Sequence, residues 1–425
     1  MVDVARVKMF GMIVGTFRWD DAYGVARFEY DRQFVGKGIE PSPLMMPVQQ
    51  GRIYSFGNLN REVFNGLPGM LADSLPDTYG RALFDKWLAM TGRTVSNPIE
   101  TLCFLGQRCM GALEFEPATG PVPANMKLEI DSLVEVAKEA LSKKEEFGTN
   151  LDADRKAAIA EILRLGTSAG GQRAKAVIAY NKETGEVRSG QVQVPTGFDY
   201  YLIKLDGVSA EAGFKETENF GRLEYSFSQL AKKCGIEMTE CSLIEENGRA
   251  HFLTKRFDRV NGEKIHMQTL CGIAHYDFHL RRAYSYEQAF NVMRRLRLPY
   301  SQAEEMFLRM VFNVVIRNQD DHTKNISFLM GKAGKWNLSP AYDLGFAYNP
   351  KGAWTDTHQM SINGKFDDIT RQDLLACAAS NNIKNAAEII DKICEEASKW
   401  PEIAKNCGVP QEMINARLPY MLLDI

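Results

Sequence analysis

A run of polar side chains between an apolar helix and an apolar strand is the feature that most restricts the fold of this chain. Residues 311–330 read VFNVVIRNQDDHTKNISFLM: an apolar helical pattern reaches Asn318, polar residues fill 319–325, and the apolar strand ISFLM follows. The apolar elements on both sides are expected to be buried, so they hold the polar loop in place. The pattern therefore predicts a loop that is held in place by its buried neighbours and carries polar side chains for a functional site.

The spacing within this loop indicates phosphoryl transfer. Transfer to a hydroxyl needs a carboxylate that accepts the hydroxyl proton and oxygen ligands for Mg²⁺, which kinases supply from an Asp and an Asn five residues later. Asp320 and Asn325 have that spacing, and residues 338–349, LSPAYDLGFAYN, place Asp343 after an apolar strand and a Pro turn. An isolated Asp in a turn commonly caps that turn. Two such loops in this order favour a catalytic site instead.

Upstream residues offer a candidate phosphate-binding loop. The segment 166–175, GTSAGGQRAK, contains Gly166, Gly170 and Gly171 among small residues, so backbone amides could approach a phosphate closely. It lacks both G-x-G-x-x-G and G-x-x-x-x-G-K-[ST]. A plain turn therefore remains the alternative for this segment on its own.

Lys204 interrupts the apolar strand YYLIKL, where a lysine is unfavourable unless its ammonium reaches water or an anion. Strand alternation opposes the face of Tyr200, Leu202 and Lys204 to that of Tyr201, Ile203 and Leu205. Binding a phosphate is one interpretation, and an edge or snorkelling lysine is the other. Glu224 is a candidate ion-pair partner in a predicted helix, with Glu216 and Glu218 as competitors.

His322 has two interpretations. It could bind a metal in a hydrolase site together with Asp320, Asp321 and Asp343, but the sequence has no second His nearby to complete the usual ligand set. A structural histidine that ties the loop to neighbouring backbone is favoured.

The first part of the chain predicts a small β-rich module. Residues 4–17 and 24–34 alternate as strands do, and 64–90 combine a Gly/Pro-rich turn with a helix that starts near Asp77. Residues 118–127, ATGPVPANMK, contain two prolines and little apolar content, and they are the expected domain boundary.

Later patterns predict a mixed lobe and then a mainly helical lobe. The mixed lobe is expected to contain helices at 128–146, 152–165 and about 217–234, and strands at 176–180, 199–205 and 251–258. Everything after about residue 275 has a helical period, apart from a strand pair at 326–329 and 335–338. We therefore expect an α+β chain with domains at 1–120, 121–258 and 259–425.

Composition limits the class of protein and its compartment. A chain of 425 residues with 45% hydrophobic residues can bury a large core, and its net charge of −3 argues against direct binding of nucleic acid or membrane. Eight cysteines occur without C-x-x-C pairs or zinc-type spacing, which predicts reduced, mostly structural thiols. No signal-peptide pattern or apolar run of about 18 residues occurs, so a cytoplasmic protein is expected.

The chain resembles the HipA-type serine/threonine kinase toxins of bacterial type II toxin–antitoxin systems. The motifs that carry this resemblance follow the family order and span most of the chain: FNGLPGMLADSLPD (64–77), TSAGGQRAK (167–175), IKL (203–205), LEYSFSQLAKKCGI (223–236), KRFDR (255–259), NQDDHTKN (318–325) and LSPAYDL (338–344). The resemblance implies a two-lobed protein-kinase-like core, preceded by the β-rich N-terminal module.

The resemblance also implies roles for single residues. Asp320 looks like the catalytic base, Asn325 and Asp343 like the Mg²⁺ ligands, and Lys204 like the phosphate-binding lysine. The implied ATP site consists of Thr167, Ser168, Ala169, Gly170, Gly171, Lys204, Lys255, Phe257, His322, Asn325 and Asp343. The family phosphorylates itself in its glycine-containing loop, which points to Ser168 or Thr167 as the acceptor.

The resemblance implies partners as well. Such kinases pair with a helix-turn-helix antitoxin of the HipB type that contacts operator DNA, and known members phosphorylate aminoacyl-tRNA synthetases. Two other functions are compatible with the motifs: a small-molecule phosphotransferase on the same scaffold, and a catalytically silent scaffold that binds an antitoxin–DNA complex.

Overall fold

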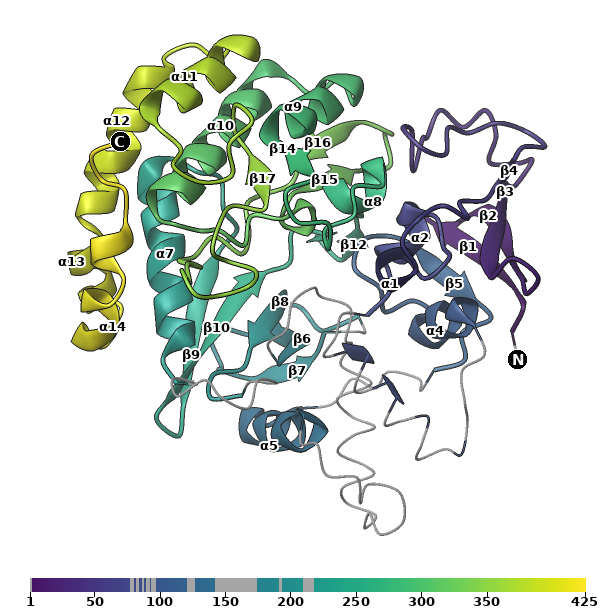
Figure 1. The fold of residues 1–425 in the computed structure, drawn as a ribbon. Coiled ribbons are helices and arrows are strands. Elements are labelled where there is room, and N and C mark those ends of the chain that lie inside the picture. The colour runs from purple at the N-terminus through teal and green to yellow at the C-terminus, as the bar shows by residue number, and fades with distance from the viewer. Residues whose placement is uncertain are drawn as a thin grey trace.

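The computed structural model describes residues 2–76, 80–81, 84–85, 88, 92, 97–120, 127–141, 174–190, 193–208 and 218–425. In these residues an N-terminal β-rich module and a C-terminal group of helices lie at opposite sides of a central mixed part, as Figure 1 shows. The α+β fold class expected from the sequence is confirmed, with sheets concentrated in the first part of the chain and helices in the last.

The N-terminal module is an antiparallel five-stranded sheet in the order β4-β3-β2-β1-β5. Its strands are β1 (Val4–Met9), β2 (Met12–Asp20), β3 (Val25–Tyr30), β4 (Ile53–Tyr54) and β5 (Glu114–Glu116). Alternate residues of β1 are buried, namely Ala5, Val7 and Met9, as expected for a sheet with one face on the core. The helices of this module are α1 (Arg61–Phe64), α2 (Gly69–Ala72) and α4 (Pro98–Leu105).

The central part contains a second five-stranded sheet in the order β7-β6-β8-β10-β9. Its strands are β6 (Lys175–Tyr180), β7 (Val187–Ser189), β8 (Asp199–Lys204), β9 (Cys241–Glu246) and β10 (Arg249–Lys255). Helix α5 (Ile130–Leu141) precedes the sheet, and helix α7 (Phe220–Cys234) packs on β9 and β10. The close approach of α7 requires glycine, because a Cβ at Gly221 would lie 1.9 Å from the carbonyl oxygen of Ala250.

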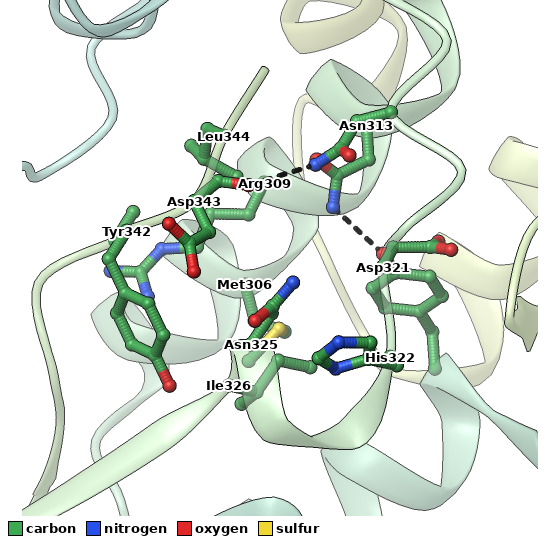
Figure 2. Close-up of a pocket in the computed structure, with 13 residues that line it drawn as sticks. Met306, Arg309, Asn313, Asp321, His322, Asn325, Ile326, Tyr342, Asp343 and Leu344 are labelled. Atoms are coloured by element: carbon green, nitrogen blue, oxygen red, sulfur yellow. Dashed lines mark hydrogen bonds between the residues drawn. The ribbon is translucent and has the colours of Figure 1, made fainter. Parts of the chain in front are cut away.

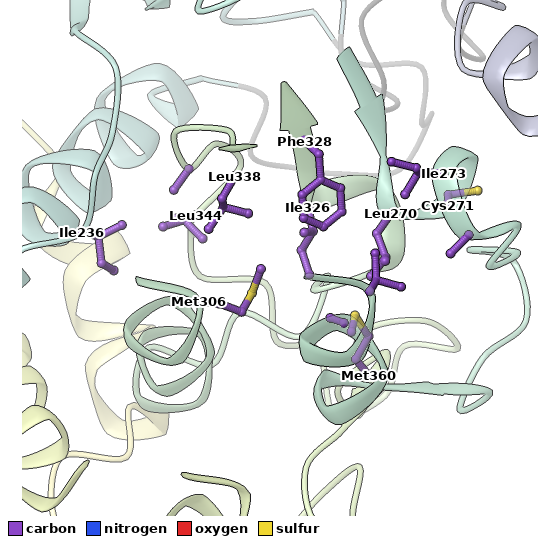
Figure 3. Close-up of a cluster of buried hydrophobic side chains, with 14 of the residues drawn as sticks. Ile236, Leu270, Cys271, Ile273, Met306, Ile326, Phe328, Leu338, Leu344 and Met360 are labelled. Atoms are coloured by element: carbon purple, nitrogen blue, oxygen red, sulfur yellow. The ribbon is translucent and has the colours of Figure 1, made fainter. Parts of the chain in front are cut away.

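The C-terminal part is mainly helical and surrounds a three-stranded sheet in the order β13-β15-β16. The helices are α8 (Leu270–Ala274), α9 (Tyr286–Arg295), α10 (Tyr300–Val315), α11 (Arg371–Ser380), α12 (Ala386–Ser398), α13 (Trp400–Asn406) and α14 (Gln411–Asn415), with 3-10 turns η2 (Thr323–Asn325) and η3 (Leu418–Tyr420). The sheet strands are β13 (His266–Thr269), β15 (Ser327–Met330) and β16 (Trp336–Leu338). Figure 3 shows apolar side chains of one buried cluster, including Phe328 on β15, Met306 on α10 and Ile326 just before β15.

One expectation for this part is wrong. We expected a helical period throughout after residue 275 except for one strand pair, and β15 and β16 are that pair. Residues 339–370, however, contain no helix and lie as irregular chain with a short strand β17 (Met360–Ser361), which pairs in parallel with β14 (Tyr284–Ser285). This stretch is fixed by side-chain hydrogen bonds to the polar loop, which periodicity does not register.

The motif at 64–77 connects the N-terminal module to the C-terminal part. The Gly69 N–H donates to His275 Nε2 at 3.0 Å, and Asp73 accepts from both the backbone N–H and the hydroxyl of Thr269 at 2.7 and 2.8 Å. A Cβ at Gly69 would lie 2.1 Å from the Gly272 carbonyl oxygen, so only glycine allows α2 to approach α8 this closely. Helix α8 in turn contacts η2, which is part of the polar loop. The N-terminal module is therefore connected to the polar loop through α8.

Other expectations have mixed outcomes. The helix expected at 128–146 is present as α5 over Ile130–Leu141, while the helix at 152–165 and the helix start near Asp77 lie outside the described residues. The eight cysteines are all free thiols, and six of them are buried. Across the described ranges, no helix is long and apolar enough to cross a membrane. Two further short strands, β11 (Arg259–Val260) and β12 (Glu263–Lys264), form a hairpin.

Candidate active site

The polar loop between α10 and β15 holds Asp320 in a defined orientation. The Asn325 side-chain N–H donates to the Asp320 carbonyl oxygen at 2.8 Å, which closes the loop on itself. The indole N–H of Trp354 donates to Asp320 Oδ1 at 2.6 Å, and His322 Nε2 lies 3.8 Å from the same oxygen. The Asp320 side chain keeps 43% of its surface exposed. It is therefore fixed by neighbours and still reachable from solution.

The electrostatic surroundings of Asp320 suit a proton acceptor. Burial raises the pKa of Asp320 above its ordinary value, and the nearby Asp343 and Asp321 carboxylates raise it further. His322 and the Trp354 N–H act in the opposite direction. A carboxyl group with a raised pKa is a stronger base than an ordinary one, which favours proton transfer to it near neutral pH.

Asp321, the neighbour of Asp320, points the other way and is buried. Its carboxylate accepts hydrogen bonds from the Tyr286 hydroxyl at 2.9 Å, from His358 Nδ1 at 2.8 Å and from the Gln359 N–H at 2.8 Å. A buried carboxylate with three donors anchors the loop to α9 and to the irregular stretch. The two adjacent aspartates thus have separate roles. Asp321 is buried and anchors the loop, whereas the side chain of Asp320 is accessible to solvent.

Lys204 pairs with two carboxylates from different parts of the chain. Its Nζ is 2.5 Å from Glu224 Oε1 on α7, and it also forms an ion pair with Asp343. Although burial lowers the pKa of Lys204, Asp343 and Glu224 outweigh it and raise the pKa. Strand β8 lies between β6 and β10, which excludes an edge lysine. Among the candidate partners, Glu224 makes the contact, Glu218 is exposed, and Glu216 lies outside the described residues.

Asp343 sits in an unusual backbone conformation. Its φ is +53°, in the left-handed region that non-glycine residues rarely adopt, and the Asn318 amide donates to its carbonyl oxygen at 3.3 Å. Burial raises the pKa of Asp343, but Lys204 outweighs it and the net pKa is lowered, so the carboxylate is ionised. The side chain remains 32% exposed. An ionised, partly exposed carboxylate in a constrained turn is suited to bind a cation.

A pocket lies beside Asp343, Asn325 and His322. Its polar lining comes from Tyr286, Arg309, Asn313, Asn318, Asp321, His322, Asn325, Tyr342 and Asp343. In Figure 2 the side chains of Asp343, Asn325 and His322 lie around the same space. The His322 Nδ1 is buried and has no hydrogen-bond partner among the described residues, so it is available to a ligand. Asp320 does not line this pocket.

The donor atoms at this site fit Mg²⁺. Asn325 uses its amide N–H on Asp320, so its amide oxygen is the atom left for a ligand, and Asp343 adds a carboxylate. Hard oxygen donors of this kind are those that Mg²⁺ prefers, usually together with substrate phosphates and water. Among the described residues, no group of three His, Cys, Asp or Glu side chains could hold a metal alone.

The remaining predicted site residues are Lys255, Phe257 and five residues of the glycine-containing loop. Lys255 pairs with Asp199 at 2.7 Å on the surface of the sheet, and its backbone N–H bonds to the Glu240 carbonyl. The ring of Phe257 lies 5.8 Å from that of Tyr342. The loop residues Thr167, Ser168, Ala169, Gly170 and Gly171 lie outside the described residues.

The end of that loop is nevertheless fixed in position. Strand β6 begins at Lys175, which is paired in register with Lys204 on β8. The Lys175 charge also lowers the pKa of Asp343. The chain therefore leaves the glycine-containing segment directly beside the Lys204 cluster.

Sequence reasoning missed Trp354 and the anchoring role of Asp321. Trp354 is 34 residues from Asp320 in a stretch with neither helical nor strand period, so no local pattern identified it. A weak signal existed for Asp321, because two adjacent Asp side chains on a constrained loop cannot readily face the same way.

Comparisons with known proteins agree with this architecture. The model of the HipA N-terminal domain matches residues 5–116, and that of the HipA-like C-terminal domain matches residues 167–400, which is more than half of the chain. A "Putative kinase" of Haemophilus influenzae is 27% identical over 139 residues. The match covers 28% of this chain and 39% of that protein, so the chain spans about two fifths of its length.

Two solved structures are similar to this protein. HipA of Shewanella oneidensis MR-1, solved with HipB and its operator DNA, superposes with a TM-score of 0.66 at 18% identity over 95% of this chain and 90% of that one. The Helicobacter pylori proinflammatory kinase CtkA gives a TM-score of 0.35 at 15% identity over 53% and 88%. The Shewanella structure shows a shared fold along nearly the whole chain. With both of its domain models matched in order, this chain belongs to the HipA family.

Proposed function

We propose that this protein is an ATP- and Mg²⁺-dependent serine/threonine protein kinase that acts as the toxin of a toxin–antitoxin pair. The observation that carries the proposal is the Lys204 cluster, in which one strand lysine contacts both Glu224 and Asp343. This arrangement brings a phosphate-binding lysine and a metal ligand together, as phosphoryl transfer requires. Asp320 and Asn325 complete the set on the neighbouring loop.

In the proposed reaction, Asp320 accepts the proton of the acceptor hydroxyl. A bond forms between the hydroxyl oxygen and the γ-phosphorus of ATP, the bond from that phosphorus to the β–γ bridging oxygen breaks, and ADP leaves. Lys204 offsets negative charge on the phosphates, and Glu224 keeps the lysine directed at them. Asn325 and Asp343 would hold Mg²⁺, which supplies further charge neutralisation when bound. His322 offers its free Nδ1 to the nucleotide.

The proposed partners follow from the family and from charge. A HipB-type helix-turn-helix antitoxin is proposed to bind the kinase and contact operator DNA, as the composition of the Shewanella complex suggests. The net charge of −3 agrees with indirect DNA contact. A translation-related protein, such as an aminoacyl-tRNA synthetase, is proposed as the substrate.

Self-phosphorylation on Ser168 or Thr167 is proposed to switch the enzyme off. A phosphate there would add a charge of roughly −1.5 to −2 near the ATP phosphates, or recruit Arg173 and Lys175 and so pull the loop out of the site. The register of Lys175 beside Lys204 supports the position of this loop next to the nucleotide. Mass spectrometry of active protein and of the Asp320→Ala variant tests this step. Absence of phosphate on 166–175 in the active form, or full ATP affinity of the phosphorylated form, would contradict it.

A transfer assay with labelled ATP and Mg²⁺, with and without a bacterial lysate, tests the activity. We expect labelled protein in the lysate and a drop of at least about 100-fold in Asp343→Asn, because a charged oxygen ligand is lost. Asp391→Asn, an exposed Asp on α12, is the matched control and should keep full activity. Label only in small molecules would indicate a small-molecule phosphotransferase, and no transfer at all would indicate a scaffold.

A further inference from the structure

Trp354 makes a contact with Asp320 that the reaction as described above does not use. Its indole N–H donates to Asp320 Oδ1 at 2.6 Å, a short hydrogen bond to a carboxylate. No described residue donates to the other oxygen, Oδ2, in a side chain that is 43% exposed. One oxygen of the candidate base is thus held by the protein, and the other accepts no hydrogen bond from a described residue.

The stretch 347–359, which carries Trp354, is fastened to the polar loop at several points. The Gln319 N–H donates to the Ala347 carbonyl oxygen at 3.1 Å, and the Gln359 N–H donates to Asp321 Oδ1 at 2.8 Å. The Gln359 side chain donates to the Trp354 carbonyl oxygen at 2.5 Å. Arg281 forms an ion pair with Asp356 in the same stretch. Trp354 therefore lies in a stretch that several hydrogen bonds and an ion pair hold in place. It does not reach Asp320 from a loose surface loop.

We propose that Trp354 is a positioning residue that fixes the rotation of the Asp320 carboxylate and leaves Oδ2 directed to the acceptor hydroxyl. This inference rests on the proposed kinase function. A carboxylate that turns freely would spend part of its time with neither oxygen aligned, whereas one fixed by an N–H donor is preorganised for proton acceptance. The hydrogen bond also favours the ionised form of Asp320, which is the form that accepts a proton.

The competing account is that Trp354 blocks the acceptor. In that case the indole occupies the place of the substrate hydroxyl, and its removal speeds the reaction. The two accounts predict opposite changes in rate. A merely structural role predicts a third result, in which loss of rate follows loss of folded protein.

The test compares Trp354→Phe with wild type in protein phosphorylation. Phe keeps an aromatic ring but has no N–H, so we expect kcat to fall about tenfold while KM for ATP changes less than about twofold. His322, Asp321 and Asp343 also face Asp320, but they are unchanged in both proteins.

Trp336→Phe is the matched control, since it also removes a part-buried indole N–H, one that donates to the Glu40 carbonyl away from this site. It should leave kcat and KM for ATP unchanged. A higher kcat/KM for the acceptor in Trp354→Phe, or an unchanged kcat, would overturn the proposal. Inactive wild type would instead refute the kinase function.

A spectroscopic measurement on folded wild-type chain does not depend on Trp354→Phe being stable. The chain has five Trp residues, so indole ¹⁵N labelling gives few N–H signals. We expect one signal to shift in Asp320→Asn relative to wild type. If no indole signal responds to Asp320→Asn, the hydrogen bond is absent in solution and the inference is wrong.

Discussion

Lys204 is the residue on which the charge balance of the site depends. Its side chain and that of Glu224 are about 15% exposed, and Asp343 is the third charged group in the cluster. Removing the lysine leaves two carboxylates without their cation, and breaking one partner of a buried pair is costly because a charge remains unpaired. The same change removes the charge that would meet the ATP phosphates.

For Lys204→Met we expect at least a tenfold fall in kcat/KM for ATP and a loss of about 1–3 kcal/mol of unfolding free energy, reduced from the fully buried value because the pairs are partly exposed. Lys332→Met is the control, since Lys332 pairs with Glu263 on the open surface. Nucleotide titration and thermal unfolding measure the two effects. Unchanged ATP affinity in Lys204→Met would support a lysine without a role at the phosphates.

The polar loop is the element in which two adjacent aspartates have opposite environments. Asp320 is accessible and has a raised pKa from burial and from Asp343 and Asp321, while Asp321 is enclosed by Tyr286, His358 and Gln359. A lost acceptor for buried donors costs roughly 1–3 kcal/mol, whereas a change at a reactive group affects rate. The loop therefore separates stability from chemistry between neighbouring residues.

We expect Asp321→Asn to lower the unfolding free energy by roughly 1–3 kcal/mol, because Asn cannot accept from all of the same donors. Asp320→Asn should leave it within about 1 kcal/mol of wild type while it abolishes phosphoryl transfer. Paired denaturant unfolding and transfer assays on both variants measure this dissociation. If Asp320→Asn is the unstable variant and Asp321→Asn the inactive one, the roles are reversed.

At the scale of the whole molecule, the buried His266 and the half-buried His275 join the N-terminal module to the C-terminal part. His266 Nε2 donates to the Pro41 carbonyl oxygen at 2.9 Å, and His275 accepts the Gly69 N–H. Burial lowers the pKa of each to about 4 from an ordinary 6.5. Both rings are neutral in the folded protein. Protonation at low pH therefore destabilises the folded state in which the N-terminal module and the C-terminal part are joined.

The sign of the pH effect follows from these values. Between pH 6.5 and 4 the unfolded chain binds the protons and the folded chain does not, so stability is complete above pH 6.5 and falls as pH decreases. Each histidine should cost about 2 kcal/mol at pH 5. We expect the melting temperature to fall less between pH 7 and 5 in the His266→Gln, His275→Gln double variant than in wild type.

The control for this measurement is His279→Gln, because His279 is exposed and should not alter the pH dependence. Asp73, whose pKa burial raises to about 6, titrates in the same range but is present in every protein compared. An equal fall in melting temperature for wild type and the double variant would show that these histidines do not couple pH to folding.

The sequence predicted those parts of the fold that depend on local periodicity and on fixed spacing. Strand β8 has the predicted alternation, with Tyr201 and Ile203 buried on one face and Lys204 on the other. Helix α7 and the pair β15 and β16 lie where apolar patterns placed them. The Asp320–Asn325 spacing could be read directly, because both residues lie on one short loop whose ends are set by buried neighbours.

Only the tertiary structure decided which distant residues meet. The pairing of Lys204 with Glu224 and Asp343 joins positions 20 and 139 residues apart, and nothing in a local pattern selects Glu224 over Glu218. Trp354 reaches Asp320 through a stretch without periodicity, held by individual side-chain hydrogen bonds. Periodicity reports which face of an element is buried, whereas such contacts depend on how whole elements pack, and that is set by the complete chain.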